Sequence, residues 1–337
     1  MTIIYALLMF CVLIFIHEFG HFIAAKACGV KVNEFALGMG PAIFKKQVGE
    51  TLYALRALPI GGFCAMEGED EDSEDERAFN NKSWWQKSII IVAGAFMNLV
   101  LCIVIMACIS FSQGTITTTI DTVQPGSPAE MAGILPGDTI TVIEGREVSS
   151  WIDVYTFIDE TEGESISLSV IGEDGLSREI ESGYTFAEDG RKIIGITATI
   201  ERSFIGAVKA GFTDTWQLGV SMLDIIKQLF TGDVPASELS GPVGIVAVVN
   251  DTASYGFIYI AFLMAIISLN LAIVNMLPFP ALDGGRLIFI IIRAVTGKAI
   301  TDEMEAKVHY VGIMLLFMLM IYVTWNDIFR FIVPLFQ

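Results

Sequence analysis

The chain of 337 residues is 53% hydrophobic and only 17% charged, which excludes an ordinary soluble domain and predicts a membrane protein. Its net charge of −18 provides no basic footprint for a phosphate backbone, so nucleic acid is excluded as a partner. The length allows several membrane-spanning helices and one water-exposed domain of roughly 100 residues. The five cysteines show no CxxC spacing, so they predict neither a zinc ribbon nor a redox motif.

Four apolar stretches are long enough to cross about 30 Å of hydrocarbon as helices. They cover residues 3–27, 88–111, 255–277 and 308–329. The first begins almost at the initial methionine, without a basic leader region or a cleavage site, so we expect a retained helix. The third runs into the sequence LPFP before an apolar run resumes at 287–295. This pattern predicts a broken helix that faces protein or a wet cavity.

The placement of lysine and arginine predicts the orientation of these spans. Basic residues crowd the first connection and the segment after the third span, and both are therefore assigned to the cytosol. The middle segment, residues 113–254, is sparsely basic and is assigned to the outside. Within the first connection, residues 32–41 and 51–66 predict short strands that fold back at the membrane surface. An interfacial loop without a binding role is the alternative interpretation.

The middle segment divides into a β-rich domain, residues 113–202, and an amphipathic helix with a linker, residues 203–254. Strand-like runs are predicted at 116–123, 140–143, 165–171, 178–180 and 192–200, with short helices at 129–133 and 151–160. From Phe204 onward apolar residues recur at four-residue steps between charges, which is typical of a helix lying on a bilayer. Residues 1–112 then contain the first two spans, and residues 255–337 contain the last two.

The clearest chemical signal is the motif HEFGH, residues 17–21, inside the first apolar stretch. Residues four apart share one face of a helix, so His17 and His21 can bind one Zn²⁺. Glu18 can then act as general base on the water of that metal. A chance match is the alternative, but three ionisable groups in a spanning helix are costly and usually functional. By helix rise the site is expected nearer the cytosolic face than the outer one.

A catalytic zinc site needs a third protein ligand and an open fourth position. Asp283 is the best candidate, because it is the only acid between Asp251 and Asp302 and follows the predicted helix break. The alternative is a plain loop aspartate that begins the next helix. His309, the remaining histidine, opens the fourth span among polar neighbours and is interpreted as structural or surface.

HEFGH in the first span and NMLPFPALDGG after the third resemble the site-2 protease family of intramembrane zinc metalloproteases. FALGMGP, LPIGGF, RAFNNKSWWQK and SGPVGI extend this likeness to the bacterial, RseP-like branch, in the same order over nearly the whole chain. The resemblance implies that His17, His21 and Asp283 hold Zn²⁺ and that Glu18 is the catalytic base. It also implies cleavage of other proteins within or near their transmembrane segments.

The resemblance further predicts the surroundings of the site. It implies that Asn98 and Asn275 lie in the active site and bind substrate backbone, with helix packing as the alternative role for Asn98. The sequence departs from the family at Ala95, which stands where the family has a proline after Gly94. The stretch from FALGMGP to LPIGGF, residues 35–63, is similar to the family's membrane re-entrant β-loop, which offers an edge strand to an unwound substrate.

Residues 127–146 resemble the PDZ domains of bacterial proteases, in a single copy. Such a domain could bind a peptide end, or could block large ectodomains from the membrane site, which is the favoured role. The predicted fold is a multi-pass α-helical membrane protein with four transmembrane helices, a re-entrant β-loop and an inserted extracytoplasmic PDZ domain. We expect it in the plasma membrane, with the lipid bilayer and single-span membrane proteins as partners. Anti-sigma factors and signal-peptide remnants are the substrates that the resemblance implies.

Two rival functions stand beside this one. A metal transporter would use the same histidines as a transit site, but it needs polar or acidic residues on several spans, and the other spans nearly lack them. An inactive scaffold would recruit partners through the PDZ domain around a vestigial metal site. The intact HEFGH motif and Asp283 argue against that reading.

Overall fold

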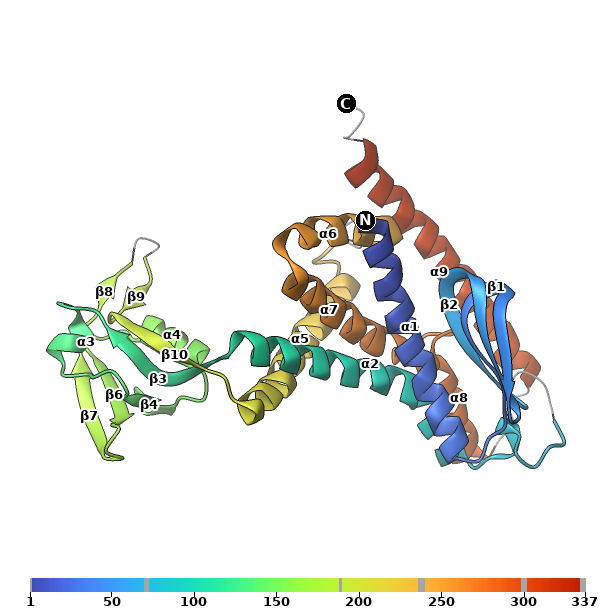
Figure 1. Cartoon of the computed structure of the whole chain (residues 1–337), viewed down its shortest axis with the longest axis horizontal. Coiled ribbons are helices and arrows are strands. Elements are labelled where there is room, and N and C mark those ends of the chain that lie inside the picture. The colour runs from blue at the N-terminus through green and yellow to red at the C-terminus, as the bar shows by residue number, and fades with distance from the viewer. Residues whose placement is uncertain (1, 70–72, 188–189, 236–239, 298–301, 334–337) are drawn as a thin grey trace. The chain divides into compact units, whose positions relative to one another are not determined.

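A computed structural model describes residues 2–69, 73–187, 190–235, 240–297 and 302–333. The chain forms two compact units, coloured along the sequence in Figure 1. A helical unit is built from Met1–Ile109 and Gly211–Gln337, and a β-rich unit from Ser110–Ala210. The two ends of the chain therefore belong to one unit, and the β-rich unit is inserted between them in the sequence.

Four helices are long and apolar enough to cross a membrane, as the sequence predicts. They are α1 (Thr2–Ala27), α2 (Trp84–Gln113), α7 (Phe257–Asn275) and α9 (Asp302–Asp327). A short 3₁₀ turn, η1 (Phe79–Asn81), precedes α2, and a π-helical turn, η3 (Ile328–Ile332), follows α9. These long apolar sequences are suited to lipid, where no water is available to the backbone. A helix is favoured there because it satisfies its backbone N–H and C=O groups with its own hydrogen bonds.

Among the described residues, three further helices lie wholly or mostly in the helical unit. They are α5 (Phe204–Thr231), α6 (Pro242–Tyr255) and α8 (Asp283–Thr296). The first matches the helix predicted from residue 204, and the last contains the apolar run predicted after the LPFP break. The middle one was missed. It begins at a proline, which suits the first turn of a helix, and its N-terminal backbone amides are bound from the far end of the chain.

Asp327 supplies that capping contact. Its buried carboxylate accepts hydrogen bonds from the backbone N–H groups of Gly241 at 3.0 Å and Gly244 at 2.7 Å. The capped helix α6 packs against α1, where Val249 joins Met9 and Leu13 in one buried apolar cluster. Helix α6 thus connects the first and the last spanning helices.

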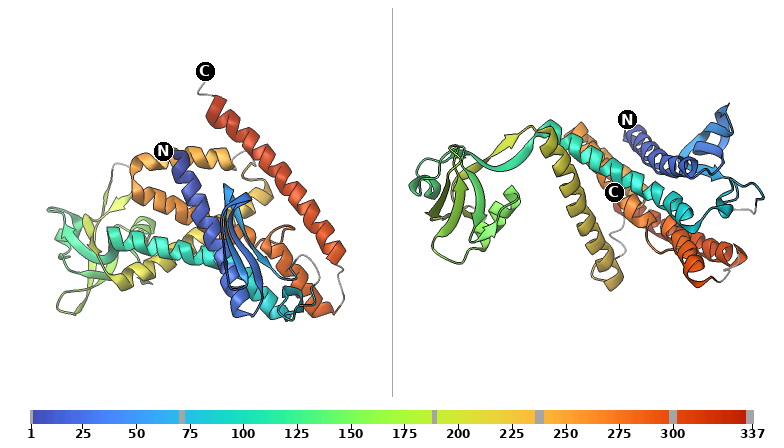
Figure 2. Two further views of the ribbon diagram at one scale, coloured as in Figure 1. Left: turned by 45° about the vertical axis from the view of Figure 1, so that its right-hand side comes forward. Right: turned by 90° about the horizontal axis from the view of Figure 1, so that it is seen from below.

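The first connection folds into two strands, β1 (Val32–Val48) and β2 (Thr51–Met66), which pair with each other alongside α1 (Figures 1 and 2). Both strands are present where the sequence predicts strands, although β1 is longer than expected. Each residue from 34 to 37 pairs with one residue of 52–55 and one of 62–65. The start of β1 therefore lies between two parts of β2, and residues 62–65 form one edge of this sheet.

The β-rich unit contains a six-stranded sheet in the order β10-β3-β4-β6-β7, with β5 attached to β4. Its strands are β3 (Thr115–Val123), β4 (Thr139–Ile143), β5 (Arg146–Glu147), β6 (Ile166–Ile171), β7 (Ser177–Ser182) and β10 (Ile196–Glu201). Helices α3 (Pro128–Met131) and α4 (Trp151–Glu160) match the two predicted short helices. Alternating apolar residues of the strands bury a core with Trp151 of α4.

The run predicted as one strand at 192–200 is two strands, β9 (Lys192–Ile193) and β10. Strand β9 pairs with β8 (Thr185–Phe186) in a separate two-stranded sheet. The run is interrupted at Gly195, whose φ of 86° lies in the left-handed region that a strand residue cannot adopt. The prediction of a single strand was wrong for this reason.

Candidate metal centre

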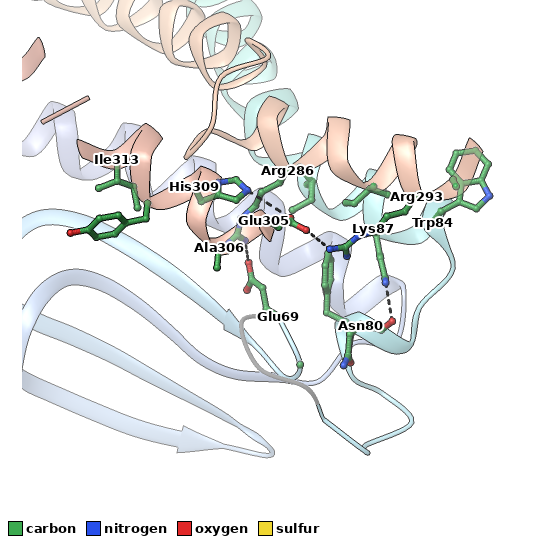
Figure 3. A pocket seen from close by; sticks show the side chains of 16 residues that line it. Glu69, Asn80, Trp84, Lys87, Arg286, Arg293, Glu305, Ala306, His309 and Ile313 are labelled. Carbon is green, nitrogen blue, oxygen red and sulfur yellow. Dashed lines mark hydrogen bonds and ion pairs between the residues drawn. The ribbon is translucent and has the colours of Figure 1, made fainter. Parts of the chain in front are cut away.

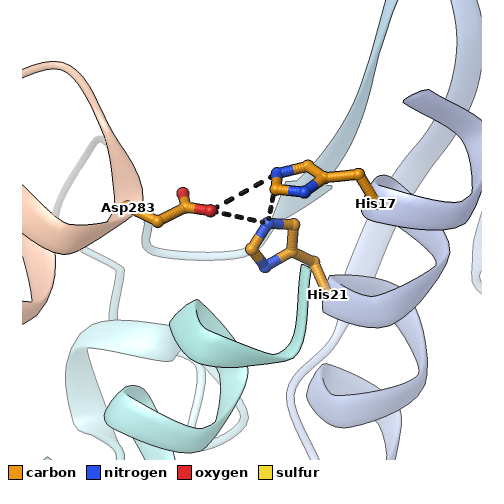
Figure 4. Close-up of side chains that lie close together, drawn as sticks. All are labelled: His17, His21 and Asp283. Carbon is orange, nitrogen blue, oxygen red and sulfur yellow. Dashed lines mark hydrogen bonds and ion pairs between the residues drawn. The ribbon is translucent and has the colours of Figure 1, made fainter. Parts of the chain in front are cut away.

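Three side chains from the two ends of the chain converge in the helical unit (Figure 4). His17 and His21 lie one turn apart on α1, and Asp283 is the first residue of α8. Asp283 Oδ2 lies 3.3 Å from His17 Nε2 and 3.5 Å from His21 Nε2, and the two Nε2 atoms are 3.3 Å apart. The structure therefore brings together the three residues that the sequence predicts as metal ligands.

The donor set fits Zn²⁺. Two imidazole nitrogens and one carboxylate oxygen are zinc donors, and tetrahedral ligands about 2.0–2.1 Å from one ion lie roughly 3.3 Å from each other. The three side chains are only 14%, 10% and 19% exposed. Asp283 Oδ2 is buried and has no hydrogen-bond partner among the described residues, so a cation would satisfy it. Three protein donors leave a fourth position for water or substrate.

Helix α2 orients both imidazoles. His21 Nδ1 donates a hydrogen bond to the carbonyl oxygen of Ile90 at 2.8 Å, which leaves Nε2 as the nitrogen that could bind a metal ion. The amide nitrogen of Asn98, Nδ2, lies 3.4 Å from His17 Nδ1, and the amide oxygen Oδ1 is buried without a hydrogen-bond partner among the described residues. Zinc binding through His17 Nε2 requires the proton on Nδ1, so the Asn98 amide oxygen is the atom suited to face it. Asn98 is itself held by Ser268, whose hydroxyl donates to its backbone oxygen at 2.8 Å.

Glycines allow α1 and α2 to approach closely enough for these contacts. A Cβ added at Gly20 would lie 2.2 Å from the backbone oxygen of Ala93. A Cβ added at Gly94 would lie 2.3 Å from His21 Nε2 and 2.8 Å from His17 Cε1. Gly94 is therefore part of the wall of the site, which the sequence reasoning did not recognise. The available signal was its spacing of four from Asn98, which places both on one face of the second span.

The loop between α7 and α8 delivers the carboxylate. Two prolines, Pro278 and Pro280, prevent the helix from continuing, and the chain folds back over the first turn of α8. A Cβ at Gly284 would lie 2.3 Å from the backbone oxygen of Leu277, and one at Gly285 would lie equally close to that of Phe279. The two residues after Asp283 must therefore be glycines, because the loop backbone passes too close to them to leave room for a side chain.

Comparison with known proteins agrees with this geometry. The family model described as peptidase family M50 matches residues 5–319. The chain belongs to this family. The resemblance to the site-2 proteases is thereby confirmed, and this M50 chain is a zinc metalloprotease of the site-2 type, for which Zn²⁺ is the expected cofactor.

The relatives of this M50 peptidase cover nearly all of it. A candidate zinc metalloprotease of Clostridium perfringens is 38% identical, with 97% of this chain and 98% of the relative covered. The regulator of sigma-W protease RasP of Bacillus subtilis is 30% identical, with 98% of each chain covered.

A solved structure matches only part of the chain. It is the PDZ domain of an SdrC-like protein of Listeria innocua, which is 25% identical and covers 25% of this chain and 96% of its own, with a TM-score of 0.23.

Of the remaining predicted site residues of the M50 peptidase, Glu18 and Asn98 lie beside the donors. Glu18 faces β2, because a Cβ added at Gly62 would lie 3.4 Å from Glu18 Cγ. Asn275 is the half-buried last residue of α7. Substrate binding by Asn98 and Asn275 stays a prediction.

Proposed function

We propose that this M50 peptidase hydrolyses peptide bonds within or near the transmembrane segments of other membrane proteins. The observation that carries the proposal is the location of the donors. His17 and His21 lie inside α1, an apolar helix long enough to span a membrane, and meet Asp283 at the end of a broken apolar segment. Ionisable side chains at such positions are costly and are retained for function.

His17, His21 and Asp283 would hold the zinc ion. When bound, zinc polarises the scissile carbonyl and lowers the pKa of its water to about 7. Glu18, next to the first ligand, accepts a proton from the attacking water and returns it to the departing amine. The backbone oxygen of Ile90 keeps His21 in the required tautomer and orientation, and Asn98 would do the same for His17 with its amide oxygen turned toward Nδ1.

The edge of the β1–β2 sheet is the proposed substrate platform. Residues 62–65 of β2 pair with β1 on one side only, within the part of the chain that the structure describes, and Gly62 lies against Glu18. An extended substrate segment can add to such an edge through backbone hydrogen bonds. A substrate helix must unwind locally before it can pair with this edge, because its backbone groups are otherwise bound within the helix. Helix-breaking residues in the substrate would make this unwinding easier.

Single-span membrane proteins are the proposed substrates, with anti-sigma factors and signal-peptide remnants as the classes. The name of the Bacillus subtilis relative, a regulator of sigma-W protease, supports the first class. The distribution of lysine and arginine supports a plasma-membrane topology with the metal centre toward the cytosol and the β-rich unit outside. In that arrangement the β-rich unit, as a PDZ domain, would keep large ectodomains away from the membrane site.

The rival function, metal transport, would need a series of metal-binding side chains along the path of the ion. The triad of His17, His21 and Asp283 is the single cluster of three or more metal-donor side chains within the described residues. A transporter would require further polar sites along several spans.

The proposal is tested with a purified, reconstituted chain and a single-span model substrate. Glu18→Gln should lower kcat/KM by about 10²-fold or more while zinc is retained, because it removes the base and leaves the ligands. Asp283→Asn should lower both zinc content and cleavage. Glu164→Gln, an exposed glutamate of the β-rich unit, is the matched control and should behave as wild type. Undiminished cleavage by Glu18→Gln, or full zinc content in Asp283→Asn, would overturn the proposal.

A further inference from the structure

Helix α9 supports the loop that carries Asp283. The backbone N–H of Ala281 donates a hydrogen bond to His309 Nδ1 at 2.9 Å. One turn further along the same face of α9, a Cβ added at Gly312 would lie 2.4 Å from the backbone oxygen of Pro280. The helix therefore contacts two successive residues of the loop, immediately before the chain reaches Asp283.

The contacted residue Ala281 has an unfavourable backbone conformation. Its φ is 78°, and among the described non-glycine residues only Glu144 shares a positive value. An L-residue rarely adopts this region, because its Cβ crowds the backbone, so the surroundings must hold it there. Two hydrogen bonds act on it: the turn bond from the Leu282 N–H to the backbone oxygen of Phe279 at 3.2 Å, and the bond from the Ala281 N–H itself to His309. Only the second comes from outside the loop.

His309 is itself fixed in the orientation that this contact requires. Its side chain is 14% exposed, its ring centroid lies 5.7 Å from that of Phe289 on α8, and its Nε2 lies 3.7 Å from Glu305 Oε1. A carboxylate beside Nε2 favours the tautomer with the proton on that nitrogen, which leaves Nδ1 as the acceptor. Figure 3 shows His309 and Glu305 together on the wall of a cavity of about 790 Å³, which Arg286 and Arg293 of α8 also line.

We propose that His309 is a positioning residue for the metal centre. It holds Ala281 in its left-handed conformation and thereby sets the Asp283 carboxylate against His17 and His21. The inference rests on the proposed role of Asp283 as a zinc ligand. It assigns a role in the site to the one histidine outside the HEFGH motif, through the backbone and without contact with the metal.

The experiment measures zinc retained against a graded chelator by the purified full chain, together with cleavage of the model substrate. His309→Ala should weaken zinc retention by about 10-fold or more, the range in which residues that orient metal ligands act. His309→Asn places an amide oxygen near the position of Nδ1 and should recover most of the loss. His309→Gln, whose oxygen corresponds to Nε2, should not recover it. Val311→Ala, at a position 57% exposed on the same helix, is the control for shortening an α9 side chain.

A second substitution tests the proposed route through the backbone. Glycine adopts a positive φ without penalty, so Ala281→Gly should be tolerated alone and should restore part of the zinc retention when combined with His309→Ala. A packing role for His309 would not produce this rescue. Wild-type zinc retention in His309→Ala, or failure of both the asparagine and the glycine rescues, would overturn the inference.

The outcome also separates this inference from the proposed function. If Asp283→Asn loses zinc while His309→Ala retains it, the metal centre stands and the positioning role fails. If Asp283→Asn retains zinc, the centre itself is wrong.

Discussion

Replacing Gly94 by alanine should damage the metal centre without damaging the fold. The added Cβ would lie 2.3 Å from His21 Nε2, whereas ordinary van der Waals contact begins at 3.4 Å. The imidazole, or the helix that carries it, must therefore move by about 1 Å, and a displacement of that size can cost about 10²-fold in rate. Alanine also has a helix propensity about 1 kcal/mol better than glycine, which offsets part of the crowding cost of the added methyl group, so the zinc-free fold should be retained.

The assay compares three quantities in Gly94→Ala and wild type: kcat/KM for a single-span substrate, zinc retention against a chelator, and the melting temperature in detergent. We expect kcat/KM to fall by about 100-fold and zinc retention to weaken, whereas the melting temperatures of the two proteins, compared after zinc removal, should stay close. Gly219→Ala is the matched control, because Gly219 also lies within a helix, α5, but has no atom within 4 Å of the added Cβ. Wild-type cleavage by Gly94→Ala would refute the close contact on which the reasoning depends.

Three further predictions concern stability. Asp327→Ala removes the acceptor of two backbone N–H groups at the start of α6, so the free energy of unfolding should fall by about 2 kcal/mol; an unchanged unfolding midpoint would contradict this. Hydrogen bonds from Ser73, Asn33 and Lys31 lower the pKa of Glu67 from 4.5 to about 2, so its carboxylate stabilises the fold fully above pH 4.5 and progressively less as the pH falls through about 2. The difference in melting temperature between wild type and Glu67→Gln should therefore shrink over that interval, and a constant difference would count against it. Removal of zinc by a chelator should lower the melting temperature of wild type but not of Asp283→Asn, because a ligand bound only by the folded state stabilises it.

Features encoded by neighbouring residues could be predicted from the sequence. The spanning helices follow from long apolar runs, and the pairing of His17 with His21 follows from a spacing of four on one helix. Asp283 could be found because acidic residues are rare in the apolar last third of the chain, so few candidates competed for the third ligand position.

Features that depend on distant contacts could not be predicted. Helix α6 is too short to span a membrane, and the carboxylate that caps it lies 83 residues beyond Gly244. The roles of Gly94 and His309 depend on how closely two helices approach and on the conformation of one loop residue. The spacing of residues along the sequence indicates neither the distance between two packed helices nor the conformation of a loop residue. The division of the predicted strand at 192–200 had a local signal in Gly195, which the reasoning did not use.

The origin of the donors at the two ends of the chain has a consequence for biosynthesis. The helix with both histidines is translated before the aspartate, which follows only after the whole β-rich unit and α5 have been made. If the three residues form the zinc centre as proposed, a polypeptide that ends before Asp283 lacks one ligand, and we expect it to be inactive during insertion. For the same reason, two separately expressed fragments divided between the β-rich unit and α7 should each be inert and should regain activity only when they associate.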